Sequence, residues 1–268
     1  MLEVLSYSFM QNAIIAAVLV SIITGIIGSL VVVNKMVFLS GGIAHSAYGG
    51  IGLAIFFGLP MLLSTSIFCL FVTVIIALAS YKKRENLDIF IGLTWAVGMS
   101  LGILLVDLTP GYQADLMSYL FGSLMAVSSD DIIYISLLLV TILGVVFVFY
   151  REILSVSYDS EYAEIRGVNT KFFYTLILML SSLTIVVSIK VVGLILVIAL
   201  LTIPIYVASF FAKSLIGMML TAALLSMMFS IVGLFFSYTY DLSSGPSIIM
   251  VGSLFTLVAL GIKSFKRV

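Results

Sequence analysis

Long runs of apolar residues, separated by short polar stretches, make up most of this chain. A membrane-spanning helix needs about 20 consecutive, mostly apolar residues, and nine segments of the sequence meet this requirement. The predicted spans are 9–33, 36–57, 60–80, 88–108, 130–150, 171–189, 192–212, 214–237 and 246–263. The pattern therefore predicts an all-α, polytopic membrane helix bundle that forms a single transmembrane domain over residues 1–268.

The composition points to the same class of protein. Hydrophobic residues make up 63% of the chain and charged residues 9%, whereas soluble domains average about 45–50% and 25%. A water-facing surface cannot be built from this mixture, so the outer surface of the bundle must face lipid. We expect the lipid bilayer as the surroundings of the protein and no nucleic acid as a partner.

The basic residues set the predicted orientation, because short cytoplasmic loops carry an excess of Lys and Arg. If the turn at 82–84 is placed inside, alternation of nine spans leaves only Lys190 outside. The other basic residues then fall inside: Lys35, Arg151, Arg166, Lys171, Lys213, Lys263, Lys266 and Arg267. The sequence thus predicts a multi-pass protein of the cell membrane with its N-terminus outside and its C-terminus inside.

Two polar stretches are too short to span the membrane. Residues 113–125 carry an apolar stripe at helical spacing, and we expect a short helix at the outer boundary there. Residues 157–167 are acidic and compatible with a helix that ends at Gly167. On the inner side, such a helix is either a docking surface for a cytoplasmic protein or an ordinary solvated loop, and its residue types allow both interpretations.

The only histidine, His45, is the main candidate for chemistry. It lies ten residues after Lys35, about 15 Å into a hydrocarbon core of about 30 Å. An ionisable group at this depth usually marks a transport path. Gly41, Gly49 and Gly52 share its side of the helix, which allows close helix packing or leaves room for a pore. The alternative is a histidine that joins two helices by a hydrogen bond.

One proline falls inside a predicted span. Pro204 lies within 192–212, where it removes a backbone hydrogen bond and should kink the helix.

Several catalytic and nucleotide-binding motifs do not occur in the sequence. It has no G-x-x-x-x-G-K-[ST] phosphate loop and no H-E-x-x-H pair, which excludes nucleotide binding and zinc catalysis by these routes. We therefore expect no catalytic residues, no tightly bound cofactor and no enzymatic activity in this chain.

Four stretches together carry a resemblance to a known family: FLSGGIAHSAYGGIGLAI at 38–55, ADLMSYLFGS at 114–123, DSEYAEIRGV at 159–168 and VVGLILVIALLTIPIYVA at 191–208. The third matches the pattern D-x-E-x-A-x-x-x-G, and the fourth has Gly193, Leu201 and Pro204 in place. Over almost its whole length the chain resembles the permease subunits of bacterial and archaeal ABC importers for zinc, manganese and iron. These permeases are related to the larger ones for cobalamin and iron–siderophore complexes.

The resemblance implies a fold, a set of partners and a role for the acidic stretch. The fold would be that of a type II ABC importer permease, with a coupling helix at about 157–168. Asp159, Glu161, Ala163 and Gly167 would contact a separate cytoplasmic ATPase subunit, which binds the ATP. The working unit would be a homodimer of permeases with ATPase subunits and an extracytoplasmic metal-binding protein.

The sequence departs from the family at one position that bears on the metal. Metal-importing members often carry an aspartate one helical turn before the histidine, where this chain has Gly41. A transit site at His45 without that carboxylate suits zinc better than manganese, which prefers oxygen ligands. Zinc is therefore the expected cargo, with manganese, iron or a metal chelate as alternatives in the same importer class. A proton-coupled secondary metal transporter is the more distant alternative.

Overall fold

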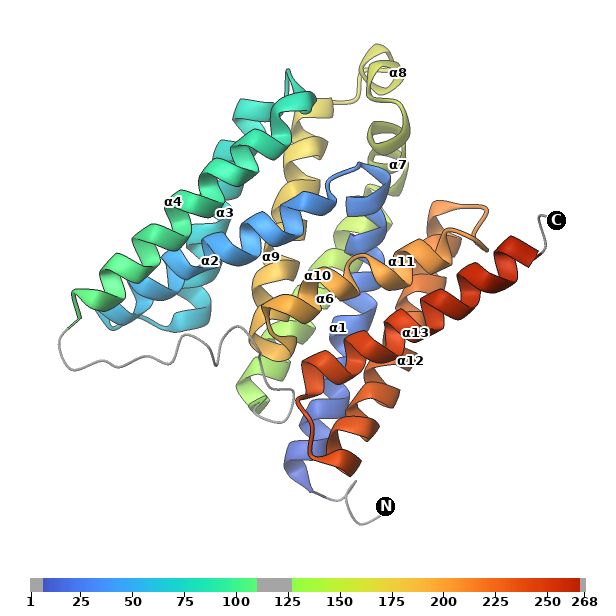
Figure 1. The fold of residues 1–268 in the computed structure, drawn as a ribbon. Coiled ribbons are helices and arrows are strands. Elements are labelled where there is room, and N and C mark those ends of the chain that lie inside the picture. Colours follow the sequence, from blue (N-terminus) through green and yellow to red (C-terminus); the bar gives the residue numbers. More distant parts are fainter. Residues whose placement is uncertain (1–6, 110–126, 266–268) are drawn as a thin grey trace.

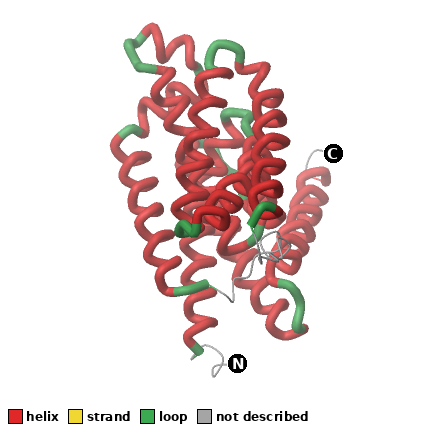
Figure 2. The backbone as a smooth tube through the Cα atoms, turned by 90° about the vertical axis from the view of Figure 1, so that its left-hand side faces the viewer, coloured by secondary structure: helices red, strands yellow, loops and turns green. Residues whose placement is uncertain are grey.

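A computed structural model describes residues 7–109 and 127–265, and within these ranges every regular element is a helix (Figures 1 and 2). The elements in chain order are α1 (Ser8–Val33), α2 (Val37–Phe57), α3 (Met61–Ser80), η2 (Arg84–Asn86), α4 (Leu87–Asp107), α6 (Ser129–Val148), α7 (Tyr150–Tyr158), α8 (Ser160–Ile165), α9 (Thr170–Val192), α10 (Leu194–Leu200), α11 (Ile203–Ala208), α12 (Leu215–Tyr240) and α13 (Ser244–Phe265). The fold is thus an all-α bundle, as predicted. The helix expected at 113–125 lies outside the described residues.

Seven helices in the described part of the chain are long and apolar enough to cross a membrane, namely α1, α3, α4, α6, α9, α12 and α13. The predicted count of nine is not confirmed by this criterion. Helix α2 has 21 residues, but its glycines, serines and His45 lower its hydropathy. The remaining predicted span, 192–212, is not one continuous helix.

The 192–212 segment divides into α10 and α11, so the prediction of a single kinked helix there is wrong. Gly193 has φ 81° and separates α9 from α10. Pro204 lies in the first turn of α11, where its missing amide hydrogen costs no helical bond. Thr202 lies in the break, and its hydroxyl donates to the Ile198 carbonyl oxygen at 2.7 Å. The proline therefore begins a new helix instead of bending an existing one.

Helices α1 and α9 form the centre of the bundle, and α4 and α13 form its edges (Figure 1). In α1 and α9, 72% of the apolar 18-residue stretch that could cross the membrane is buried, compared with 22% of the corresponding stretch in α4 and α13. Apolar residues such as Leu93 and Val97 on α4 are exposed. These faces are available to lipid or to another membrane chain, because no polar covering protects them.

The two ends of the bundle differ in the elements that they carry. The α1–α2 turn, the α3–α4 turn and α8 lie at one end, and the N-terminal end of α1 lies at the other (Figure 1). Lys190, the one basic residue that was predicted outside, forms an ion pair with Asp131. Asp131 also forms a capping box with Ser128 at the start of α6. The isolated lysine therefore has an acidic partner within the bundle.

Candidate ion path and coupling segment

His45 lies near the middle of α2 and stacks on an aromatic ring of α4. The imidazole and the Trp95 ring have centroids 4.2 Å apart and planes inclined by 6°. The His45 side chain is half-buried, and its Nδ1 atom is buried without a hydrogen-bond partner in the described part of the chain. Stacking covers a face of the imidazole and does not use the nitrogen lone pairs, which lie in the ring plane and bind metals. The structure therefore shows no hydrogen bond through Nδ1 that would make His45 a link between helices.

The close approach of α2 and α4 depends on glycines from both helices. A Cβ atom added at Gly52 would lie 2.6 Å from the Gly102 carbonyl oxygen, and one at Gly98 would lie 2.8 Å from the Ser46 Cα atom. At Gly49, the added atom would lie 3.0 Å from the Gly98 carbonyl oxygen of α4 and 2.5 Å from the Phe68 ring of α3. Small residues permit this backbone contact between membrane helices. The predicted packing role of Gly49 and Gly52 thus has a geometric basis, and this contact positions the α4 indole at the imidazole.

Gly41 differs from these packing glycines. An added Cβ atom would lie 3.7 Å from Ile198 Cδ1 and 3.9 Å from Trp95 Cζ3, which is ordinary contact distance. Packing therefore does not require glycine at this position, one turn before His45. No group of three or more His, Cys, Asp or Glu side chains able to hold a metal occurs in the residues that the structure describes. Among the described residues, His45 is therefore not part of a site with three or more such side chains.

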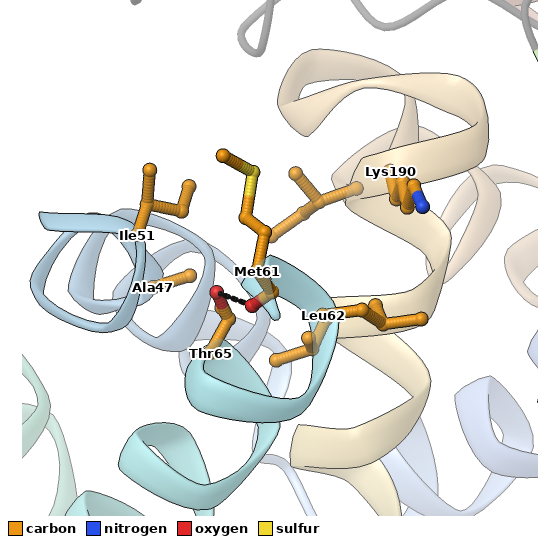
Figure 3. Close-up of a pocket in the computed structure, with 8 residues that line it drawn as sticks. Ala47, Ile51, Met61, Leu62, Thr65 and Lys190 are labelled. Carbon is orange, nitrogen blue, oxygen red and sulfur yellow. Dashed lines mark hydrogen bonds between the residues drawn. The ribbon is translucent and has the colours of Figure 1, made fainter. Parts of the chain in front are cut away.

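A small hollow between α2, α3 and α9 is not a second ion site (Figure 3). Ala47, Ile51 and Leu62 contribute apolar side chains to it. The Thr65 hydroxyl donates to the Met61 carbonyl oxygen at 2.7 Å. The hollow therefore offers no carboxylate or imidazole to a divalent cation.

The predicted coupling segment contains a short, well-terminated helix, α8. The Asp159 carboxylate caps its start by accepting from the Tyr162 amide at 2.9 Å. At its end, Gly167 has φ 81°, and its amide bonds the Glu164 carbonyl while the Val168 amide bonds that of Ala163. These two bonds form a Schellman motif, which favours glycine at this position. The structure thus accounts for Asp159 and Gly167 as the two ends of α8, a six-residue helix.

The remaining predicted contact residues have opposite environments. Ala163 is fully buried and belongs to the hydrophobic core, so it anchors α8 to the bundle. Glu161 is exposed. Three large side chains that the sequence analysis did not single out are also exposed, namely Tyr158 (64%), Tyr162 (52%) and Ile165 (85%). Tyr162 and Ile165 lie three residues apart within α8, and this spacing is the signal that could have identified them, because residues so spaced share a helix face.

Trp95 is the other site residue that the sequence analysis missed. It is the only tryptophan of the chain and lies 50 residues from His45, so no local pattern connects the two. The packing of α2 on α4 brings them together.

The bundle and the seven long apolar helices in the described residues define the class of multi-pass membrane proteins. The chain belongs to the ABC 3 transport family, whose sequence pattern it matches over residues 6–263. The family predicted from the four sequence stretches is thereby confirmed, and with it the class of ABC transporter permeases.

Relatives of this chain with known names include metal-transport membrane proteins. It is 31% identical to the high-affinity zinc uptake system membrane protein ZnuB of Haemophilus influenzae, covering 97% of this chain and 98% of the relative. It is 30% identical to the manganese transport system membrane protein MntC of Listeria monocytogenes, covering 95% and 91%. It is also 42% identical to the uncharacterized membrane protein slr2045 of Synechocystis, covering 98% and 94%.

A solved structure shares the fold. PsaBC from Streptococcus pneumoniae, in complex with Fab, is similar with a TM-score of 0.83 and 28% identity, covering 95% of this chain and 91% of that chain.

Proposed function

We propose that this chain is the membrane permease subunit of an ATP-driven importer for divalent metal ions, with zinc as the cargo. The observation that carries the proposal is the His45 imidazole, which lies near the middle of α2 with Nδ1 buried and without a hydrogen-bond partner. The family and relatives named for zinc and manganese uptake support transport of a divalent cation.

The residue types around His45 favour zinc over manganese. Helices α2 and α10 contain no acidic residue, and α4 has acids only at its ends, Asp88 and Asp107. Manganese prefers oxygen ligands, whereas imidazole suits zinc. Two copies of the chain would present two His45 side chains to the ion, with water completing its coordination. Weak binding in transit suits this role, because a pathway must release its ion.

The assembly proposed here contains two permeases, cytoplasmic ATPase subunits and an extracytoplasmic metal-binding protein. The seven long apolar helices, together with α2 and the α10–α11 pair, give nine crossings. With α8 on the cytoplasmic side, the N-terminus lies outside and the C-terminus inside. ATP is bound by the partner subunit, which moves α8 and thereby switches the bundle between outward-open and inward-open states.

In this proposal, the coupling contact is formed by the exposed surface of α8. Glu161, Tyr162 and Ile165 would contact the ATPase directly. Asp159, Ala163 and Gly167 would hold that surface in place as cap, anchor and terminator. Force transmission requires a rigid element, and α8 is fixed at both ends by the hydrogen bonds described above.

Zinc uptake and ATPase activity in proteoliposomes, reconstituted with the ATPase and binding protein, test the proposal. His45→Ala should lower zinc uptake, and Glu161→Lys and Gly167→Val should lower zinc-stimulated ATPase activity. Gly144→Val is the matched control, because an added Cβ atom there meets nothing within 4 Å. Uptake driven by a proton gradient without ATP would instead identify a secondary transporter, and undiminished coupling in both α8 variants would refute the role of α8.

A further inference from the structure

A second hollow lies at the end of the bundle that carries α8, where the α1–α2 turn, the start of α4, α7 and α9 meet. It measures about 300 Å³, and its lining includes Asn34, Lys35, Arg84, Ser157 and Tyr174. This volume lies at the lower limit of small-molecule sites and fits a small polar group. It takes no part in the ion path described above.

The hollow carries two positive charges without a counter-charge. Neither Lys35 nor Arg84 has an ion pair in the described residues, where Lys190–Asp131 is the pair found. The Arg84 guanidinium carbon lies 4.8 Å from the centre of the Tyr174 ring, which holds the arginine at the hollow. Glu85 and Asp88 follow Arg84 in the sequence, but neither belongs to the lining.

Two helices also begin at this hollow. Helix α2 follows Met36 and α4 begins at Leu87, both of which line the hollow. Neither helix has a side-chain hydrogen bond at its N-cap. The unbonded amides in the first turn of α2 carry partial positive charge and favour an anion, whereas the Leu87 amide at the start of α4 already bonds the Arg84 carbonyl oxygen. The backbone therefore adds to the field of the two side chains.

Lys35 adopts a backbone conformation that favours glycine. Its φ is 57°, and it ends α1 in a Schellman motif through the bonds Lys35 N to Val32 O and Met36 N to Val31 O. A non-glycine residue in this region is strained, and such strain often occurs at functional sites. Lysine therefore occupies this position at the hollow although the backbone conformation favours glycine.

The hollow also offers a hydrogen-bond donor and an acceptor. The Asn34 side-chain nitrogen donates to the Ser157 hydroxyl oxygen at 2.9 Å, which leaves the Ser157 hydroxyl hydrogen available to a ligand. Asn34 Oδ1 is buried and has no partner within the described ranges, so an acceptor beside the hollow lacks a donor. Together with the two cations, these groups match a phosphate that has a hydroxyl beside it.

We propose that this hollow binds a phosphate group, either from the headgroup of an anionic phospholipid such as phosphatidylglycerol or from free phosphate. Basic pockets between membrane helices on the cytoplasmic side are suited to anionic headgroups. Because Ser157 lies in α7, directly before α8, a bound phosphate would join the α1–α2 turn and α4 to the coupling segment. The cytoplasmic placement of the hollow and this regulatory consequence rest on the proposed function, whereas the binding itself does not.

Binding is tested on the purified full chain, without ATPase or metal, so that the result does not depend on transport. Native mass spectrometry and thermal unfolding are measured with phosphatidylglycerol, phosphatidylcholine or inorganic phosphate. We expect Lys35→Gly and Arg84→Gln each to weaken phosphate-group binding roughly five-fold. Lys82→Gln is the matched control, because Lys82 is an exposed cation near Arg84 that does not line the hollow.

Lys35→Gly gives a second readout that separates binding from folding. Without ligand, this variant should unfold at the same temperature as the native chain or a higher one, because glycine relieves the backbone strain. Loss of phosphatidylglycerol binding alone would identify the lipid as the ligand, and loss of inorganic phosphate binding would identify free phosphate. Equal binding of both by the native chain and the two variants would overturn the proposal.

Discussion

The contact between α2 and α4 leads to a sharp prediction for Gly102→Ala. A Cβ atom at this position would lie 2.2 Å from the Tyr48 carbonyl oxygen and 2.4 Å from its carbonyl carbon. Ordinary contact begins at 3.4 Å, so the α4 backbone must retreat by about 1.2 Å. Both obstructing atoms belong to the backbone of α2, so no side-chain rotation can relieve the clash. Overpacking of this kind typically costs about 1–3 kcal/mol.

The same displacement should reach His45, because Trp95 lies two turns before Gly102 on α4. We expect Gly102→Ala to lower the midpoint of thermal unfolding by several degrees and to reduce zinc uptake. The control is Gly92→Ala on the same helix, where an added Cβ atom meets nothing within 4 Å. There, alanine should be neutral or stabilising by up to about 1 kcal/mol. Equal stability and uptake in the two variants would show that α2 and α4 do not pack as described.

Three further predictions concern the ion path and the outer ion pair. In Gly41→Asp, the added Cβ atom meets only ordinary contacts and the carboxylate lies one turn from His45. In a competition uptake assay, the preference should therefore shift from zinc towards manganese, and an unchanged preference would argue against transit past this site. Trp95→Leu should reduce zinc uptake more than Trp95→Phe, since only phenylalanine keeps an aromatic face on the imidazole, and equal losses would contradict that role. In thermal unfolding, a double-mutant cycle of Asp131→Asn and Lys190→Met should give a coupling energy of about 1 kcal/mol, and a value near zero would mean that the pair does not stabilise the bundle.

The boundaries of most spanning helices could be predicted from the sequence. The predicted spans 9–33, 60–80 and 88–108 correspond within one residue to Ser8–Val33, Met61–Ser80 and Leu87–Asp107. These ends are well defined because polar turns follow apolar runs of a length set by the membrane. The apolar run at 192–212 gave no comparable sign of its break, because the break depends on backbone angles and not on polarity.

The candidate site was predicted only in part. His45 was identifiable, because a single ionisable group in a long apolar segment is conspicuous. Its stack on Trp95 and the hollow beside Lys35 arise from contacts between residues far apart in the chain, which a single sequence does not encode in any local pattern. Ala163 illustrates the same limit, since the family motif marks it for the coupling segment while only packing shows that it is buried.

The glycine contact between α2 and α4 also constrains how the protein can change shape. Two helices whose backbones touch at several levels cannot slide or separate without losing all of those contacts together. We therefore expect α2 and α4 to move as one rigid body. Helix α3 approaches α2 in the same way, since a Cβ atom added at Gly50 would lie 2.5 Å from the Thr65 Cα atom. Any alternation of access should therefore take place at the borders with α9 and α10. His45 would move with this rigid body, so the imidazole would change its access from one opening to the other together with Trp95.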